Sequence, residues 1–222
     1  MKSPFKFYFL IFFFIIFSTY NTNNIKINFN IFFPIKKIVI ENNVVMNIFE
    51  YKSDLKFLIN TSLFFLNNEK IIATTQKYDF ISSIQIKKKY PNILKIRIVE
   101  KIPVAIQTTN RSKFYITKDN KKINFINLNI YEDLPLIFGR YKNFDIFYDD
   151  LKKNKFRISE VKAFHYFDAG RWDIILKNEK VIKLPEKNYF DLLPKINLML
   201  NDSSFTKYKI FDFRIKDQLI LK

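Results

Sequence analysis

The chain has 222 residues, which is enough for one large domain or two small ones. It contains no cysteine, and this excludes thiol nucleophiles, thiolate metal sites and disulfide bonds. Its net charge of +17 comes from lysines spread along the chain rather than massed in one block, so we expect a solvated charged surface and no nucleic-acid groove.

The N-terminal segment, residues 5–20, consists almost wholly of Phe, Ile, Leu and Tyr. As a helix it would be about 24 Å long, close to the ~30 Å of a bilayer's hydrocarbon core, with Lys2 and Lys6 on the inner side. A cleaved signal peptide is the alternative, but the residues that follow offer no alanine for a cleavage site. We therefore expect a transmembrane anchor at 5–20, a cytoplasmic tail at 1–4 and translocation of the remaining chain.

The next part of the chain predicts a small α+β unit at residues 35–102, after an Asn-rich linker at 21–34. Residues 46–59 carry apolar side chains three or four positions apart, which is the spacing of one helix face. We expect two helices covering one face of a three-stranded sheet. The predicted order is strand 35–41, helix 46–59, a shorter helix ending near 76, and strands 84–88 and 93–100.

Pro103 marks a boundary, because it removes a backbone donor where the alternation of the preceding strand stops. Residues 103–222 then predict a mainly antiparallel β domain with two helices. Because Pro194 lies inside the second predicted helix, that helix either begins at Leu193 or bends at the proline. Strands are predicted at 104–108, 114–117, 122–126, 158–167, 172–177, 180–184, 208–215 and 218–221, and helices near 146–155 and 189–200.

The sequence offers no catalytic constellation. His165 is the single histidine, and no carboxylate stands at a spacing typical of a triad or a metal site. Asp149 and Asp150 are adjacent, so they would not face each other on a helix. The sequence contains no P-loop, G-x-G-x-x-G or G-x-S-x-G motif. We expect no catalytic residue, no metal site, no cofactor and no small-molecule substrate.

Six short stretches, spread in a consistent order behind the predicted anchor, carry a resemblance. They are 78–81 (Tyr-Asp-Phe-Ile), 89–94 (Lys-Tyr-Pro-Asn-Ile-Leu), 99–105 (Val-Glu-Lys-Ile-Pro-Val-Ala), 134–139 (Leu-Pro-Leu-Ile-Phe-Gly), 171–176 (Arg-Trp-Asp-Ile-Ile-Leu) and 211–214 (Phe-Asp-Phe-Arg). Together they resemble the FtsQ/DivIB family of bacterial cell-division proteins, the first three looking like the end of a POTRA domain. The chain departs from the family at Phe80, where Trp is frequent, and at Asn42-Asn43, where Gly-Asn is frequent.

The resemblance implies a non-enzymatic, single-pass protein of the cell inner membrane whose periplasmic POTRA and β domains bind other division proteins at the septum. In the family, late strands of the β domain dock small coiled-coil partners, FtsB and FtsL, partly by strand addition. Carried over by motif, Arg171 and Arg214 with Ile215 fall at partner-contact positions. An exposed C-terminal strand that includes Leu219, Ile220 and Leu221 would offer the edge that strand addition needs.

Each of these hypotheses has an alternative. Arg214 would instead pair with Asp212 on the same face of its strand, and Arg171 would belong to a turn after Gly170. Trp172 alternates with apolar neighbours, so we interpret it as core rather than as a contact residue. A different function also stays open, namely a POTRA-type chaperone or export accessory protein that holds client strands.

Overall fold

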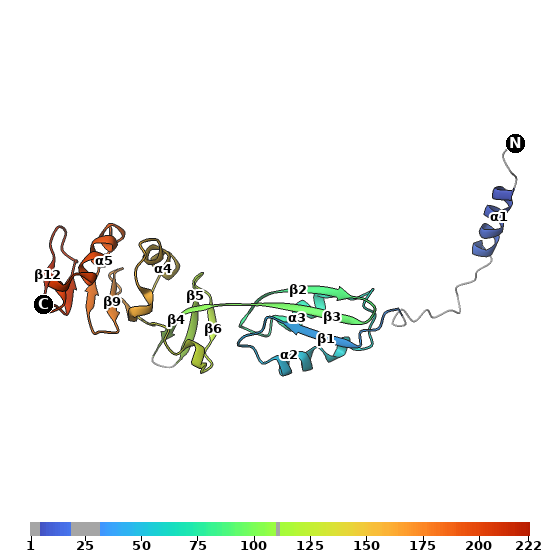
Figure 1. Ribbon diagram of the computed structural model, residues 1–222, viewed down its shortest axis with the longest axis horizontal. Helices are drawn as coiled ribbons and strands as arrows, with labels where there is room; N and C mark the ends of the chain where they lie inside the picture. The colour runs from blue at the N-terminus through green and yellow to red at the C-terminus, as the bar shows by residue number, and fades with distance from the viewer. Residues whose placement is uncertain (1–4, 19–31, 110–111) are drawn as a thin grey trace.

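The computed structural model describes residues 5–18, 32–109 and 112–222, and the expected tail at 1–4 and most of the expected linker lie outside these ranges. Residues 32–222 form an elongated α+β body with two sheets (Figure 1). A three-stranded sheet lies at the end where the chain enters, and a nine-stranded sheet continues from it to the C-terminus. The predicted α+β class is therefore confirmed.

Helix α1 spans Phe5–Ser18, fourteen residues, which gives a length of about 21 Å at 1.5 Å per residue. Its apolar side chains from Phe7 onward are largely exposed. Within the described ranges, no helix combines the length and the apolar character needed to cross a membrane. The last two residues of the expected anchor, 19 and 20, lie outside those ranges.

The three-stranded sheet has the strand order β1-β3-β2, with β1 parallel and β2 antiparallel to β3. Asn47 and Asn67 start the two helices, since their side chains accept hydrogen bonds from backbone N–H groups of the first turn. The predicted helix 46–59 is divided at Leu55 into an α-helix and a 3-10 turn. The elements are β1 Lys37–Glu41, α2 Ile48–Asp54, η3 Lys56–Leu58, α3 Asn68–Thr75, β2 Ile81–Lys89 and β3 Ile93–Glu100.

The nine-stranded sheet has the order β12-β11-β10-β9-β8-β7-β4-β5-β6. It is mixed, because β10 with β11, β4 with β7 and β7 with β8 run parallel. The prediction of a mainly antiparallel domain missed β7 and these pairings. The strands are β4 Pro103–Thr108, β5 Lys113–Thr117, β6 Lys122–Asn124, β7 Leu136–Phe138, β8 Val161–Tyr166, β9 Trp172–Leu176, β10 Val181–Lys183, β11 Ile210–Asp212 and β12 Ile220–Leu221.

Helices α4 (Phe144–Lys153) and α5 (Leu193–Asn201) pack their apolar faces on one side of this sheet. Trp172 is 4% exposed and stacks on Phe147 of α4, with ring centroids 4.6 Å apart, so its predicted core position is confirmed. Pro194 lies in the first turn of α5, where its missing N–H costs no helical hydrogen bond. The helix therefore begins at Leu193 rather than bending at the proline.

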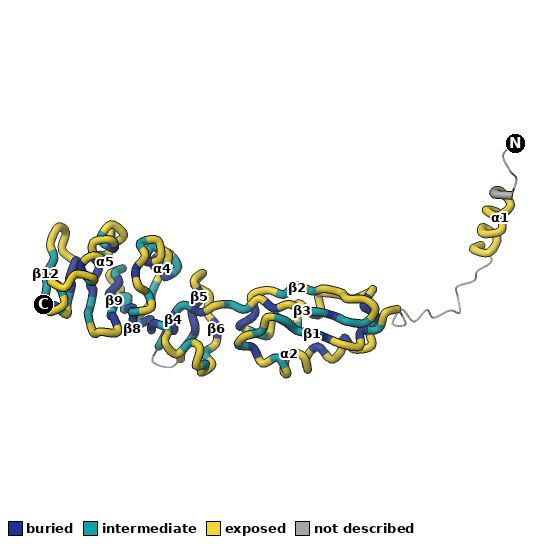
Figure 2. Tube along the Cα trace, viewed as in Figure 1, coloured by how far each residue is buried: buried dark blue, intermediate teal, exposed yellow. Residues whose placement is uncertain are grey.

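The two sheets meet at a small apolar cluster, to which the first unit contributes Phe80 and the second Ile106, Tyr115 and Ile123. The chain crosses between them at residues 101–102. Glu100 anchors this crossing, because its carboxylate accepts hydrogen bonds from the backbone N–H groups of residues 44–46 at 3.0–3.2 Å. The buried residues follow the inner sides of both units (Figure 2), and those among the described residues lie between positions 35 and 213. A fragment of residues 32–222 therefore keeps the core that the described residues form.

Candidate functional site at the C-terminal sheet edge

Strand β12 forms one edge of the nine-stranded sheet and pairs antiparallel with β11. It consists of Ile220 and Leu221, two of the residues that the sequence predicts to contact a partner. Ile220 is 38% exposed, whereas Leu221 and Leu219 pack against the main core. The edge is thus short and held by its own side chains, and one apolar side chain is left at the surface.

The hydrogen-bond ladder determines which backbone groups of β12 face outward. Lys222 and Ile210 exchange two bonds, with N···O distances of 3.1 and 3.0 Å. In an antiparallel ladder such pairs alternate with non-hydrogen-bonded pairs. Leu221, which lies opposite Phe211, therefore turns its N–H and C=O away from β11, while Ile220 turns its own toward β11. The outer side of the edge presents the backbone groups of Leu221.

A hollow of about 670 Å³ lies beside this edge. Arg214, Ile215 and Leu219 line it together with the loop after β10. Ile215 is 51% exposed, so an apolar side chain is presented at the rim. Five of the six predicted partner-contact residues are thereby brought to one surface, made up of β12 and the loop between β11 and β12. We call it the C-terminal edge surface.

A row of polar side chains crosses the sheet next to the C-terminal edge surface. In register, His165 lies opposite Asp173, Asp173 opposite Lys183, Lys183 opposite Asp212, and Asp212 opposite Ile220. Residues paired in this way point to the same face of a sheet. Charges therefore alternate across β9, β10 and β11 on the side opposite the main core.

Arg214 forms a two-pronged ion pair with Asp212. Its Nε donates to the two carboxylate oxygens at 2.8 and 3.0 Å, and its Nη2 donates to Oδ2 at 2.5 Å. The Arg214 guanidinium holds the pKa of the Asp212 carboxyl below its ordinary value. The pairing weighed as an alternative from the sequence is thus present, and 41% of the Arg214 side chain remains exposed beside the hollow.

Arg171, the sixth predicted contact residue, lies apart from β12. Its guanidinium carbon is 4.2 Å from the centre of the Phe167 ring, and its Nε is 3.9 Å from Asp173 Oδ1, too far for a hydrogen bond. Burial raises the pKa of the Asp173 carboxyl, and the positive charges of Arg171, Lys183 and Arg214 oppose that rise. Arg171 thus belongs to the inner end of the charged row.

His165 lies between Phe138 and Asp173 in the sheet, with its ring 4.7 Å from the Phe138 ring. The carboxylate that lies opposite it in register is that of Asp173. Across the described residues, no group of three or more His, Asp or Glu side chains is placed to hold a metal ion. The surroundings of His165 are those of a sheet surface rather than of a reaction centre.

Sequence reasoning missed Asp173 and Lys183 as members of this surface. The signal was present, since Asp173 interrupts the apolar residues of its strand and Lys183 stands between the buried Ile182 and Leu184, so both lie on the opposite face. What alternation cannot tell is that β9, β10 and β11 are neighbours in this order. The row exists because tertiary pairing brings the three strands together.

Comparisons with known proteins support the resemblance. Residues 33–101 match the family model described as the FtsQ-type POTRA domain. The chain is 25% identical over 213 residues to the cell division protein FtsQ of Rickettsia conorii, covering 92% of this chain and 78% of that protein. It is 27% identical over 159 residues to FtsQ of Rhizobium meliloti, covering 70% and 51%. The chain is thus similar to FtsQ over most of its length, and its first unit matches the FtsQ-type POTRA domain. The POTRA match covers the unit that contains β1, β2 and β3.

Proposed function

We propose that this chain, which is similar to FtsQ, is a non-enzymatic scaffold of bacterial cell division that captures another division protein at the C-terminal edge surface. The observation that carries the proposal is the outward-facing N–H and C=O of Leu221 on β12, next to a hollow with an exposed apolar rim. An extended segment could pair with β12 and seat a side chain against Ile215. The relatives' names supply the process, cell division.

The partners proposed are small coiled-coil division proteins of the FtsB/FtsL kind. Their segment would run along β12, and Arg214 would offer its exposed guanidinium to a carboxylate or carbonyl on it. Backbone pairing at such an edge contributes about 0.5–1.5 kcal/mol per hydrogen bond, so β12 alone cannot hold a partner and the hollow must contribute. Arg171 would act through Asp173 and Lys183 rather than by direct contact.

The proposed topology places residues 1–4 in the cytoplasm and residues 5–20 across the inner membrane. Residues 21–34 would be a linker, 35–102 a periplasmic POTRA domain and 103–222 the β domain. The apolar composition of α1 supports this arrangement. Septal location follows from the role as a scaffold, and a fluorescent fusion should gather at mid-cell during constriction.

The test of strand capture compares two changes at one residue. Leu221→Pro removes the outward N–H and places the proline ring in the partner's path, whereas Leu221→Ala shortens the same side chain and keeps the N–H. Co-purification of the full-length chain with a co-expressed FtsB-like partner should fall at least about tenfold for Leu221→Pro, the equivalent of ~1.4 kcal/mol. Leu221→Ala should retain most of the binding.

Circular dichroism of both variants serves as the folding control. Ile220 is unsuitable for the proline, because its N–H faces β11 and its loss would disturb the sheet itself. Equal capture by the Leu221→Pro and Leu221→Ala variants would exclude pairing along the outer side of β12.

A further inference from the structure

Exposed aromatic residues gather at the end of the first unit where the chain enters. Phe32 is 52% exposed, Phe33 43%, Phe64 58% and Tyr90 49%. Single exposed apolar residues are ordinary on protein surfaces, but several together mark an interaction surface. We call these four residues the aromatic end.

Hydrogen bonds and a ring contact tie the four residues into one surface. The rings of Phe33 and Tyr90 meet edge to face, with centroids 5.1 Å apart. The Ser62 hydroxyl donates to the Phe32 carbonyl at 2.7 Å and accepts from the Phe64 N–H at 3.2 Å. Three segments distant in sequence therefore converge here, and their backbone contacts do not depend on the exposed rings.

Lysines surround the aromatic end. Lys36, Lys88 and Lys89 are exposed, and the Lys88 ammonium donates to the Phe64 carbonyl at 3.0 Å. Phe32, Phe33 and Lys36 line a shallow hollow of about 390 Å³. Among the described residues, no carboxylate lies within 4.0 Å of these three ammonium groups.

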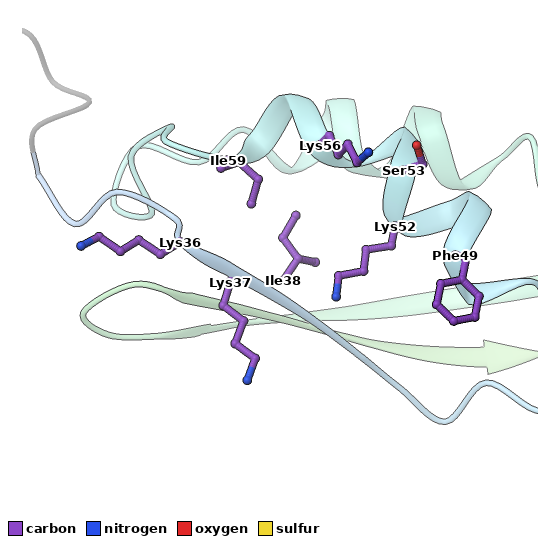
Figure 3. A pocket seen from close by; sticks show the side chains of 8 residues that line it. All are labelled: Lys36, Lys37, Ile38, Phe49, Lys52, Ser53, Lys56 and Ile59. Carbon is purple, nitrogen blue, oxygen red and sulfur yellow. The ribbon is translucent and has the colours of Figure 1, made fainter.

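A second hollow, of about 500 Å³, continues from Lys36 along β1. Figure 3 shows its lysines arranged around Ile38, between β1 and the helical segment α2–η3. Neither hollow has an Asp or Glu in its lining. The basic surface is therefore continuous with the aromatic end. The lysines that line the second hollow are Lys36, Lys37, Lys52 and Lys56.

Aromatic rings beside lysines that lack a carboxylate partner are the side chains that settle at the interface of an anionic bilayer. We propose that the aromatic end and Lys36, Lys88 and Lys89 lie against anionic lipid headgroups. Phe32 is fourteen residues beyond the end of α1, so the chain between them reaches at most about 50 Å. The orientation rests on the proposed membrane insertion of α1, whereas the lipid affinity does not.

Two observations favour a lipid surface over an acidic protein segment. The aromatic rings project at a blunt end rather than lining a closed groove, and the two hollows are shallow and open. The surface also lies at the end nearest to α1 in sequence, while the C-terminal edge surface lies at the opposite end of the body (Figure 1). Lipid contact here would leave that edge free for a division partner.

The experiment uses the fragment 32–222, which keeps the core that the described residues form and lacks α1. Its sedimentation is measured with vesicles of mixed phosphatidylglycerol and phosphatidylcholine, and with phosphatidylcholine alone. We expect binding to the anionic vesicles that weakens as salt rises, and at least about tenfold weaker binding to the neutral ones. The proximal variant combines Phe32→Ser, Phe64→Ser, Lys36→Gln and Lys89→Gln.

The matched control removes as many apolar groups and positive charges from the distal unit. Each lysine near an anionic surface contributes about fivefold to affinity, so the proximal variant should bind vesicles at least roughly twentyfold more weakly. The vesicle affinity of the control should change less than about threefold. An equal loss in both variants would reduce the effect to net charge and overturn the proposal, as would absent binding by the unaltered fragment. The control combines Phe190→Ser, Leu198→Ser, Lys187→Gln and Lys195→Gln.

Because the fragment has no anchor and an intact β12, its failure to bind vesicles would leave the proposed partner capture untouched. Conversely, loss of capture in the Leu221→Pro variant would leave vesicle binding unchanged. A full-length chain in nanodiscs adds a geometric readout. Since the sequence has no cysteine, a single introduced Lys89→Cys can carry a fluorophore, whose quenching by spin-labelled lipid should exceed that of the same label at Lys195→Cys.

Discussion

Truncation of Phe80 tests whether the junction between the two sheets is a packed interface. Phe80 is 6% exposed, and its ring meets Tyr115 of β5 edge to face with centroids 5.9 Å apart. Phe→Ala changes in cores cost about 3–5 kcal/mol, of which an aromatic pair contributes about 0.5–1.5 kcal/mol. The cluster is small, and its neighbouring side chains can partly fill the cavity. We therefore expect Phe80→Ala to lower the free energy of unfolding by about 3 kcal/mol.

Urea unfolding of the fragment 32–222 provides the assay. Trp172, the single tryptophan, is buried in the second unit and reports that unit alone, whereas circular dichroism reports both. The two transitions should coincide in the unaltered fragment and separate in Phe80→Ala, because the junction no longer couples the units. Phe49→Ala is the matched control, since its ring is 84% exposed and its loss should change stability by less than about 0.5 kcal/mol.

A loss of less than about 1 kcal/mol in the free energy of unfolding of Phe80→Ala, with coincident transitions, would contradict a packed interface at the junction. That result would mean that Glu100 and the chain crossing hold the units together without the apolar cluster. A cost as large as expected, with coincident transitions, would indicate that the two units unfold as one body even when the cluster is weakened.

Two further changes test the C-terminal edge surface and the sheet. Arg214→Gln should lower the free energy of unfolding by about 1 kcal/mol at pH 7, a value discounted because the arginine side chain is 41% exposed. This difference between the variant and the unaltered protein should vanish as pH falls through the lowered pKa of Asp212, since the ion pair contributes only while that carboxylate is ionised. Thermal unfolding at pH 7 and near pH 2 would show this, and an equal difference at both values would contradict it. Gly139→Ala should lower the free energy of unfolding by more than about 3 kcal/mol or prevent folding. The reason is that φ at this position is +95° and the added Cβ would lie 2.1 Å from the Tyr166 carbonyl oxygen. A soluble variant with an unaltered unfolding transition would refute this.

Local sequence patterns account for most of the helices and strands of this protein. Apolar spacing predicted the helix at 46–59, which the structure divides at Leu55 into α2 and η3. Strand β3 has the predicted bounds 93–100. Alternation also placed Trp172 in the core. These features succeed because periodicity depends on residues a few positions apart, so its physics is written in the local sequence.

The tertiary structure decided what depends on neighbours distant in the chain. Strand β7 has three residues, too few for a period to be recognised, and it exists because β4 and β8 pair with it on both sides. The charged row across Asp173, Lys183 and Asp212 arises from strand order and register. The outward direction of Leu221 follows from its phase in the ladder with β11. Local sequence encodes which face a side chain occupies, whereas pairing between strands, stabilised by burial of the shared core, decides what that face meets.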